Sequence, residues 1–569
     1  MRGSKAPIIL SLLFLVIFTI PVFYLIYGST YFKLGNVPTA TWQDFLDMIT
    51  SPLTGALLVN TVVYAVCGGL LAVAFATIYA WIVHRTDIPG KRILGLVAVL
   101  PLTTPFLVKA FSWIYLFSPN IGIANIALHQ LFGIGSVFNI YSMYGLILAL
   151  GTGGMPLAYL TIEPAIKSLN PHLEEASRIA GHSLLATLRR ITIPVLLPAI
   201  FSAFLLEMII GLENFDYPFI LGQPGGVDTL ATEIYFNIFD RQPPRYASAA
   251  MISVIYIILT MATVAIYIYA TRKAFKFVTV TGKAPQRSLH KLHRWKYGAL
   301  AICIIILFFT FILNYATLIL MSFTYYFSAG GGQLHLVFSG LKNYADALNL
   351  PLFYNALGNS IILGIAAGTI GTIVAVFLSY AALKSKVRGA RLVDFVSTIP
   401  LAFPGIVYGL ALFWTFLLIP GVSGIIYGTI WPLVLALVFV RLPYSVRMIS
   451  GSVIQIADEL EESSRVSGAS WGRTLYKIVL PLLKGGMLNS FLYTFINSIR
   501  ELGAIVLLTT GQTIVLTTLL LQLYSQHPLA LNTIAAASVM LSLLVMVVLA
   551  IPGLIQFISD RRRKKTPKS

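Results

Sequence analysis

Residues 174–183 read EEASRIAGHS, and residues 461–470, 287 positions later, read EESSRVSGAS. The similarity continues to a proline in each copy: across 174–194 and 461–481, ten of 21 aligned residues are identical. A segment that recurs at so long an interval indicates a duplicated structural unit. We therefore expect the chain to consist of two related halves.

The chain around these charged segments is strongly apolar. Of its 569 residues, 57% are hydrophobic and 10% are charged, and the mean hydropathy is +0.86. Soluble proteins average about 25% charged residues, so this composition predicts an all-α polytopic membrane protein. A helix needs about 20 apolar residues to cross the bilayer, and twelve such runs occur, at about residues 8–28, 57–82, 93–117, 143–162, 195–217, 249–271, 298–322, 357–383, 392–417, 429–446, 485–509 and 533–558.

The positive charge alternates from loop to loop. If the N-terminus lies inside, 32 of the 39 Lys and Arg residues fall in inside segments, four in outside loops and three within helices. The positive-inside rule then places both termini in the cytoplasm. The most basic segments, 272–296 and 561–565, are expected to contact anionic lipid headgroups. The chain has a net charge of +19. We expect its basic residues to contact the lipid bilayer, and we expect no nucleic-acid partner.

The repeat extends over nearly the whole chain. Residues match at an offset of 299 in the first part of each half and at 287 beyond the third helix, as in Asn60 and Asn359, Pro101 and Pro400, Pro105 and Pro404, Gly181 and Gly468, and Pro194 and Pro481. Six helices per half is an even number, so both halves enter the membrane in the same direction. This predicts two parallel six-helix repeats with a pathway between them. The predicted domains are residues 1–275, a basic cytoplasmic linker at 276–296, and residues 297–569.

Each repeated segment lies in the longest inside loop of its half. Its small residues would let a short helix enter a groove on another protein, with an Arg at the rim. Gly181 and Gly468 are expected to end that helix in a left-handed conformation, and Ser183 and Ser470 to cap the next helix. The alternative is an ordinary amphipathic connector, which two copies with the same spacing disfavour.

Both segments resemble the motif E-A-A-x-x-x-G, nine residues, I-x-L-P of permease subunits in binding-protein-dependent ABC importers. The first copy departs from it at Ser177 and Ile193, and the second has Ser463 and Ser464 at the two small positions. The resemblance implies a type I ABC importer fold in a prokaryotic cytoplasmic membrane. It also implies coupling helices that dock on an ATP-binding subunit, formed here by Glu174, Glu175, Ala176, Ser177, Arg178 and Gly181 and by Glu461, Glu462, Ser463, Ser464, Arg465 and Gly468.

The same resemblance implies partners. The chain has no G-x-x-x-x-G-K-[ST] stretch, so we expect it to bind no nucleotide and to be a transport subunit rather than an enzyme. ATP-Mg would be held by two copies of a separate ATP-binding subunit, and a solute-binding protein would act outside. ATP would draw the coupling helices together and rotate the two bundles by rigid-body alternating access. We expect no cofactor and no metal site, since Cys67 and Cys303 fall in helices and His290 and His293 have no further ligands nearby.

Ionisable residues within predicted helices form a second group of candidates, because each is costly in the bilayer. They are expected to form the translocation path or a gate, with ion pairing between helices and direct substrate contact as alternatives: Glu207, Glu213, Asp216, Arg500 and Glu501. Glu213 and Glu501 are near-equivalent across the repeat. Lys109 and Arg441 are expected to snorkel or pair. The outside loop at 222–246 is the expected surface for a binding protein.

The substrate is inferred from the resemblance alone. Fused permeases are similar to the ferric-iron and thiamine branch, and residues 118–125 and 212–235 resemble the iron branch. We therefore expect ferric iron, with thiamine, a polyamine or an oxyanion as alternatives within the same class. An ion-coupled secondary transporter is the alternative from another class, and the paired loops disfavour it.

Overall fold

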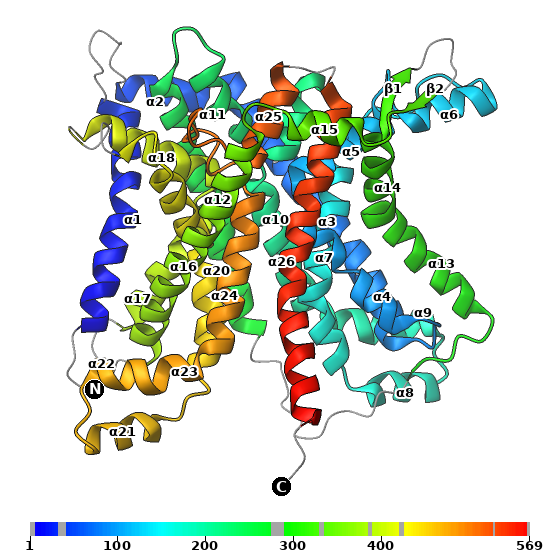
Figure 1. Cartoon of the computed structure of the whole chain (residues 1–569). Coiled ribbons are helices and arrows are strands. Elements are labelled where there is room, and N and C mark those ends of the chain that lie inside the picture. Colours follow the sequence, from blue (N-terminus) through cyan, green and yellow to red (C-terminus); the bar gives the residue numbers. More distant parts are fainter. Residues whose placement is uncertain are drawn as a thin grey trace. The chain divides into compact units, whose positions relative to one another are not determined.

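The computed structural model describes residues 6–31, 41–274, 289–328, 335–384, 390–419, 421, 426–526 and 530–565 (Figure 1). These residues are almost entirely helical, and β1 (Thr324–Ser328) and β2 (His335–Phe338) pair antiparallel in a hairpin. Among the described residues, nine helices are long and apolar enough to cross a membrane. Three bent helix pairs bring the number to twelve if each pair forms one span. Every predicted apolar run overlaps one of these, which confirms the all-α membrane fold.

The chain divides into two compact units that do not follow its halves in order. Unit 1 comprises residues 1–50, 234–257 and 345–569, and unit 2 comprises residues 51–233 and 258–344. The predicted bounds at 275 and 297 follow the sequence repeat, whereas the compact units exchange the first helix of each half. Neighbouring positions in the chain do not dictate which apolar helix faces pack together.

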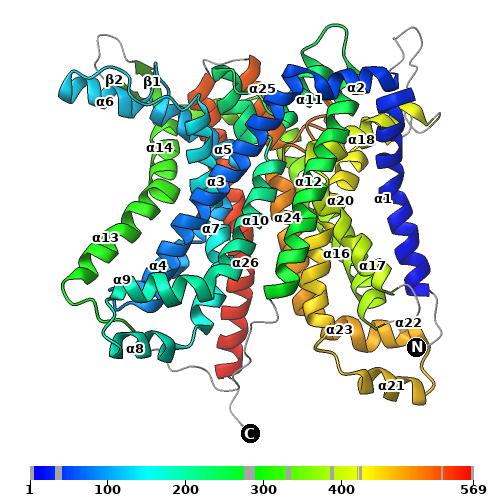
Figure 2. The same ribbon diagram turned by 180° about the vertical axis from the view of Figure 1, so that it is seen from behind.

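Unit 2 contains most of the first half. Its elements are α3 (Pro52–Arg85), α4 (Lys91–Val97), η1 (Leu100–Thr103), α5 (Phe106–Phe117), α6 (Ile123–Phe132), α7 (Met143–Ser168), α8 (Pro171–Ile179), α9 (Leu184–Thr187), η2 (Leu188–Thr192), α10 (Ile193–Glu213), η3 (Pro218–Gly222), η4 (Gln223–Gly225), α13 (Trp295–Leu307), η6 (Phe308–Ile312), α14 (Leu313–Ser322), β1 and β2. Helices α13 and α14 run beside α3 and α5 (Figure 2).

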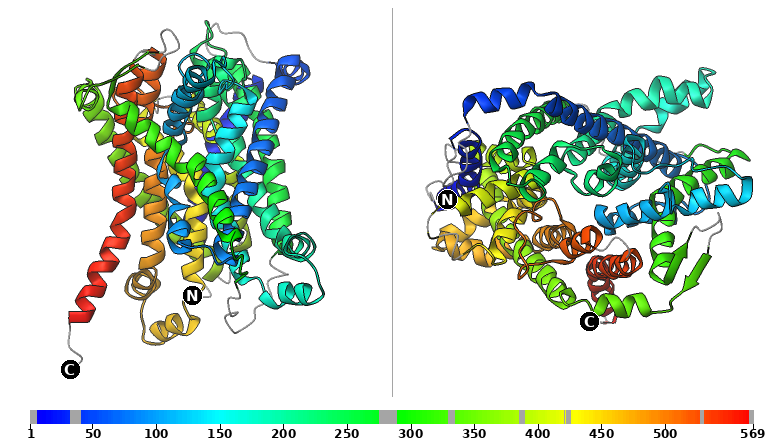
Figure 3. Two further views of the ribbon diagram at one scale, coloured as in Figure 1. Left: turned by 90° about the vertical axis from the view of Figure 1, so that its right-hand side faces the viewer. Right: turned by 90° about the horizontal axis from the view of Figure 1, so that it is seen from above.

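Unit 1 contains most of the second half. Its elements are α1 (Ala6–Tyr31), α2 (Trp42–Thr50), α16 (Phe353–Lys384), α17 (Ala390–Thr398), η8 (Ile399–Ala402), α18 (Gly405–Leu418), α20 (Trp431–Val453), α21 (Asp458–Val466), α22 (Trp471–Thr474), η9 (Leu475–Val479), α23 (Leu480–Leu482), α24 (Lys484–Arg500), α25 (Leu516–Gln526) and α26 (Leu531–Lys565). Helix α1 packs on α16 and α18, and α26 is seen along its length in Figure 3. Helices α11 (Leu230–Phe239), α12 (Tyr246–Ala274) and α15 (Lys342–Leu348) contain the unit boundaries.

Two predicted spans are broken rather than straight. The runs at 93–117 and 392–417 bend by 99° and 101° between their two helices. Thr104 and Phe403 are extended at the breaks, because the ring of the proline that follows disfavours a helical conformation. The prolines are Pro105 and Pro404, an equivalent pair, so both halves bend at the same place. The predicted helices at 195–217 and 485–509 are also too long, since α10 ends at Glu213 and α24 at Arg500.

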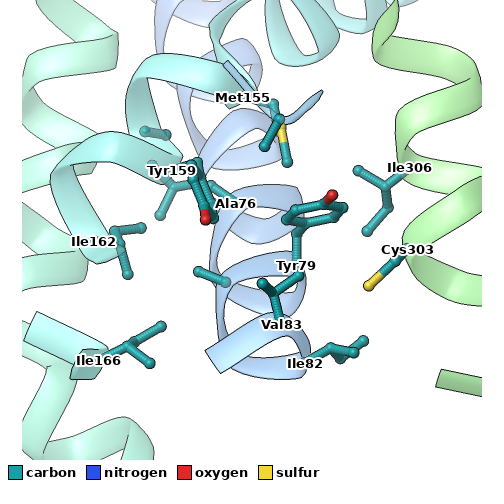
Figure 4. Close-up of a cluster of buried hydrophobic side chains, with 14 of the residues drawn as sticks. Ala76, Tyr79, Ile82, Val83, Met155, Tyr159, Ile162, Ile166, Cys303 and Ile306 are labelled. Carbon is teal, nitrogen blue, oxygen red and sulfur yellow. The ribbon is translucent and has the colours of Figure 1, made fainter. Parts of the chain in front are cut away.

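The core of unit 2 lies where α3, α7 and α13 meet (Figure 4). Tyr79 and Tyr159 contact edge to face with ring centroids 5.6 Å apart, and the Tyr79 hydroxyl donates to the carbonyl of Leu94 at 2.8 Å. Cys303 is fully buried in this cluster. Glycine lets α3 and α7 approach closely, because a Cβ atom at Gly68 would lie 2.5 Å from Cδ2 of Leu150.

Candidate functional site

We call residues 170–194 the first repeated loop and residues 457–481 the second repeated loop. Helix α8 opens the first, and its N-cap Asn170 accepts from the backbone N–H of His172 at 3.0 Å. Helix α21 opens the second. Both helices end as predicted: Gly181 and Gly468 have φ values of +86° and +78°, the left-handed region that glycine adopts without a Cβ penalty.

The second part of each loop is also the same in both halves. Ser183 and Ser470 accept from backbone N–H groups of α9 and α22, which confirms the predicted caps. A π-helical turn follows in each copy, η2 in the first and η9 in the second. Pro194 lies in the first turn of α10 and Pro481 in α23, after which the chain bends by 74° into α24.

The serines at the second small position of the motif face inward. Ser177 and Thr187 join their hydroxyls at 2.9 Å, and Ser464 and Thr474 do so at 2.8 Å. Each bond ties the first helix of its loop to the next. Ser177 is buried, whereas Ala176 and Ser463 are exposed. Ser177 is therefore satisfied within the loop, and its contact with a partner subunit stays a prediction.

Glu174 is buried and braces the first repeated loop. Its side chain is 1% exposed and pairs with Arg85 at the end of α3. It also accepts from His290 at 2.9 Å and from the Thr192 hydroxyl at 2.7 Å. Burial by itself would raise the pKa of Glu174, but the hydrogen bonds from His290, Arg85 and Thr192 outweigh it and lower the pKa to about 2. Glu174 thus braces the loop, and its contact with a docking partner stays a prediction.

Glu461 has the same role in the second repeated loop. It is buried, and its Oε2 accepts from the Tyr380 hydroxyl of α16 at 2.7 Å. Lys384 at the end of α16 donates to the carbonyl of Ile456 at 2.6 Å and pairs with Asp458. The carboxylate of Glu461 faces inward, and its predicted contact with a docking partner stays a prediction. Each loop is therefore fastened to the helix that ends beside it.

The outward faces of the loops carry the other predicted residues. Glu462 and the two arginines, Arg178 and Arg465, are exposed, and Glu175 is half-buried with His172 3.1 Å from its carboxylate. Two apolar residues missed at the sequence level lie beside them: Ile179 is 88% exposed and Val466 is 90% exposed. They are equivalent across the repeat, and an apolar residue kept in both copies of a polar segment is the signal that would have revealed them.

The ionisable residues of α10, and Asp216 just after it, lie in unit 2. Glu207 is 1% exposed, and neither of its carboxyl oxygens has a hydrogen-bond partner among the described residues. A Cβ atom added at Gly154 of α7 would overlap this carboxylate. Asp216 is buried and Glu213 half-buried. Glu207 is thus packed against α7 inside its own unit. Lys109 of α5 is also buried, with its Nζ 5.5 Å from the ring centroid of Phe106.

The second half forms an ion pair instead. Arg441 of α20 pairs with Glu501 just after α24, and both side chains are 16% exposed. Glu501 also accepts from the backbone N–H of Ala504. In the first half Asn214 accepts from the N–H of Tyr217, likewise three residues on. The structural equivalent of Glu501 is thus Asn214, not Glu213, and Arg500, a partly buried residue, ends α24.

The predicted outside surface at 222–246 is exposed in two places. Residues 223–226 and 239–243 are exposed.

Within the described part of the chain, no group of three or more His, Cys, Asp and Glu residues is arranged to hold a metal ion.

Comparisons with known proteins agree with this arrangement of repeats. The family described as "Binding-protein-dependent transport system inner membrane component" matches twice, at residues 72–276 and 360–565. A ferric transport system permease protein of Haemophilus influenzae is 28% identical over 90% of this chain and 78% of its own length. One of Actinobacillus pleuropneumoniae is 26% identical over 91% of this chain and 73% of its own. A solved bacterial ABC transporter that imports alginate is 18% identical, with a TM-score of 0.37, over 47% of this chain and 98% of its own.

The two family matches together cover more than two thirds of the chain, and each contains one repeated loop. The chain therefore belongs to the family of binding-protein-dependent transport system inner membrane components, as a multi-pass membrane protein carrying two copies of the family domain.

Proposed function

We propose that this chain is the transmembrane permease of an ATP-driven importer for ferric iron. A separate ATP-binding subunit docks on each repeated loop at the cytoplasmic face, and a solute-binding protein delivers the cargo outside. Relatives that match nine-tenths of this chain are named for ferric transport, which supports the cargo. The 32 Lys and Arg residues of the inside segments support the cytoplasmic position of the loops and of both termini.

The observation that carries the proposal is the matched build of the two loops. Each presents an exposed apolar side chain, Ile179 or Val466, beside an exposed Arg. Exposed apolar side chains next to charged ones are typical of protein interfaces. Each loop is also fixed from within by a buried glutamate. A force applied to the outer face is therefore transmitted to α3 in one unit and α16 in the other.

The mechanism that follows is mechanical. ATP binding brings two ATPase subunits together and draws the loops with them. Because Glu174 and Glu461 tie the loops to long helices, the helices move with the loops as rigid elements. The chain performs no covalent chemistry. ATP hydrolysis on the partner subunits resets the cycle.

The experiment is uptake of radioactive Fe³⁺ into proteoliposomes that contain the chain, its ATPase and its binding protein. Ile179→Asp combined with Val466→Asp places charges on the two docking faces without disturbing any buried group. We expect association with the ATPase and iron uptake to fall by at least about tenfold, as for loss of interface anchor residues.

The matched control is Leu131→Asp on α6, at the opposite end of unit 2 from α8 (Figure 1). Leu131 is 74% exposed, so both variants add charge to an exposed apolar site. Uptake without the ATPase, or full uptake by the Ile179 and Val466 variant, would contradict the proposal. Uptake of thiamine, a polyamine or an oxyanion in place of iron would keep the mechanism and replace the cargo.

A further inference from the structure

Residues 289–292, which precede α13, lie against the end of α3. His290 forms a parallel β-bridge with Thr86. Its backbone N–H donates to the carbonyl of Arg85 at 2.8 Å, and its carbonyl accepts from the N–H of Asp87 at 3.3 Å. The N–H of Leu292 donates to the Asp87 carboxylate at 2.9 Å, which lowers the pKa of Asp87. The end of the linker between the halves is therefore fastened by backbone bonds on both sides of His290.

The imidazole of His290 reaches from this bridge into the first repeated loop. It is 6% exposed and lies over Trp81, with ring centroids 6.0 Å apart and an interplanar angle of 27°. Nε2 donates to Oε2 of Glu174, since a carboxylate can only accept. Arg85 binds the same oxygen and Thr192 binds the other. His290 is the one of these donors that comes from the linker.

Among the described residues, the second repeated loop is braced without such a residue. At the offset of 299, Trp81 corresponds to Tyr380 and Arg85 to Lys384. Tyr380 binds Glu461 directly, so the helix supplies the bond that His290 supplies in the first half. Trp81 has no hydroxyl group to donate as Tyr380 does, and its ring stacks on His290 instead. The two halves therefore hold equivalent glutamates with different partners.

We propose that His290 is a positioning residue that sets the first repeated loop through Glu174, so that residues 289–292, at the end of the linker, control one of the two ATPase contacts. The proposal rests on the proposed function of the loops. His290 touches neither cargo nor nucleotide. It acts by fixing the carboxylate that joins α8 to α3.

The first test needs only the chain in detergent. Trypsin cleaves after the exposed Arg178 in the first loop and after the equivalent exposed Arg465 in the second, and mass spectrometry compares the two rates. His290→Ala is expected to raise cleavage at Arg178 several-fold relative to Arg465. His290→Gln is expected to restore the ratio, because its amide N–H can donate to Glu174. An unchanged ratio in His290→Ala would overturn the proposal.

The second test measures iron transported per ATP hydrolysed in the reconstituted complex. His290→Ala and His290→Phe are expected to lower this ratio several-fold while the ATPase still binds, and His290→Gln to restore it. His290→Phe keeps a ring against Trp81 but lacks the donor, so it separates packing from positioning. The control is His293→Asn in the same linker, where the side chain is exposed and φ is +49°, a value that Asn tolerates.

The outcomes distinguish the two proposals. If the wild-type complex transports no iron with ATP, the proposed function fails. If it does, and His290→Ala couples ATP to transport as well as the wild type, only the role of His290 is overturned. A His290→Gln variant as impaired as His290→Phe would also overturn it, since the ring and not its hydrogen bond would then matter.

Discussion

The hydroxyl of Tyr380 donates to Oε2 of Glu461 at 2.7 Å, although the two residues are 81 positions apart. This bond joins α16 to the second repeated loop at the position where the first half uses Trp81, Arg85 and the linker. A buried carboxylate without a donor is costly, so the bond holds α21 in place. The two loops have similar sequences but are fastened by different chemistry.

Removal of that hydroxyl is expected to loosen the second loop. Tyr380→Phe leaves the Glu461 carboxylate buried without its donor, and a loss of about 1 to 3 kcal/mol in local stability follows. Hydrogen exchange at the backbone amides of α21 measures it. The control is Tyr476→Phe, since Tyr476 is 73% exposed in the same loop. Equal protection of α21 in both variants would show that the bond contributes nothing.

The depressed pKa of Glu174 predicts a pH-dependent stability. Because the pKa falls from 4.5 to about 2 on folding, the carboxylate stabilises the folded chain fully above about pH 4.5. This contribution, about 3 kcal/mol, is lost as the pH falls towards 2. In detergent, the wild type should therefore unfold at a higher temperature than Glu174→Gln at pH 7. The difference between their unfolding temperatures should shrink between pH 4.5 and pH 2. A difference independent of pH would contradict the assignment.

The left-handed glycines are expected to tolerate Asn better than Ala. Nothing lies within 4 Å of a Cβ atom at Gly181 or Gly468, so the cost of substitution comes from the backbone alone. Ala should cost about 1 kcal/mol at each site and Asn less. The measurement is binding of the ATPase to each single variant and to the double variants. Ala and Asn variants that bind equally would show that φ is not the constraint.

Gly154 is expected to depend on Glu207. Gly154→Ala adds a methyl group where the carboxylate lies, which should cost about 1 to 3 kcal/mol by overpacking. Glu207→Ala removes the carboxylate, so the double variant should be less destabilised than the sum of the two single variants. Thermal unfolding of the four proteins measures this coupling. Stability losses that simply add in the double variant would show that positions 154 and 207 are not in contact.

Removing Arg441 alone is expected to cost more stability than replacing Arg441 and Glu501 together. Arg441→Met leaves a carboxylate that is 16% exposed without its ion-pair partner, at a cost of about 3 to 5 kcal/mol. Adding Glu501→Gln should recover most of it, because the amide oxygen still accepts from Ala504. Unfolding of the single and double variants in detergent checks this. A double variant as unstable as Arg441→Met would refute it.

The sequence by itself determined the membrane class, the duplication and the local geometry of the loops. The capping serines and the glycines that end α8 and α21 act on backbone groups within a few residues, so their roles follow from spacing. The sequence also located the prolines of each half. It did not show that Pro105 and Pro404 break their spans, because an apolar run of sufficient length is consistent with both a straight and a bent helix.

Only the tertiary structure decided which way the loop residues face and what holds them. Glu174 and Glu175 are adjacent and chemically identical, yet one is buried and the other is not. Two of the partners of Glu174 lie 89 and 116 positions away, at Arg85 and His290. The exchange of first helices between the units is equally invisible in the sequence. Burial and pairing depend on contacts between distant segments, and hydropathy and spacing report only on neighbouring ones.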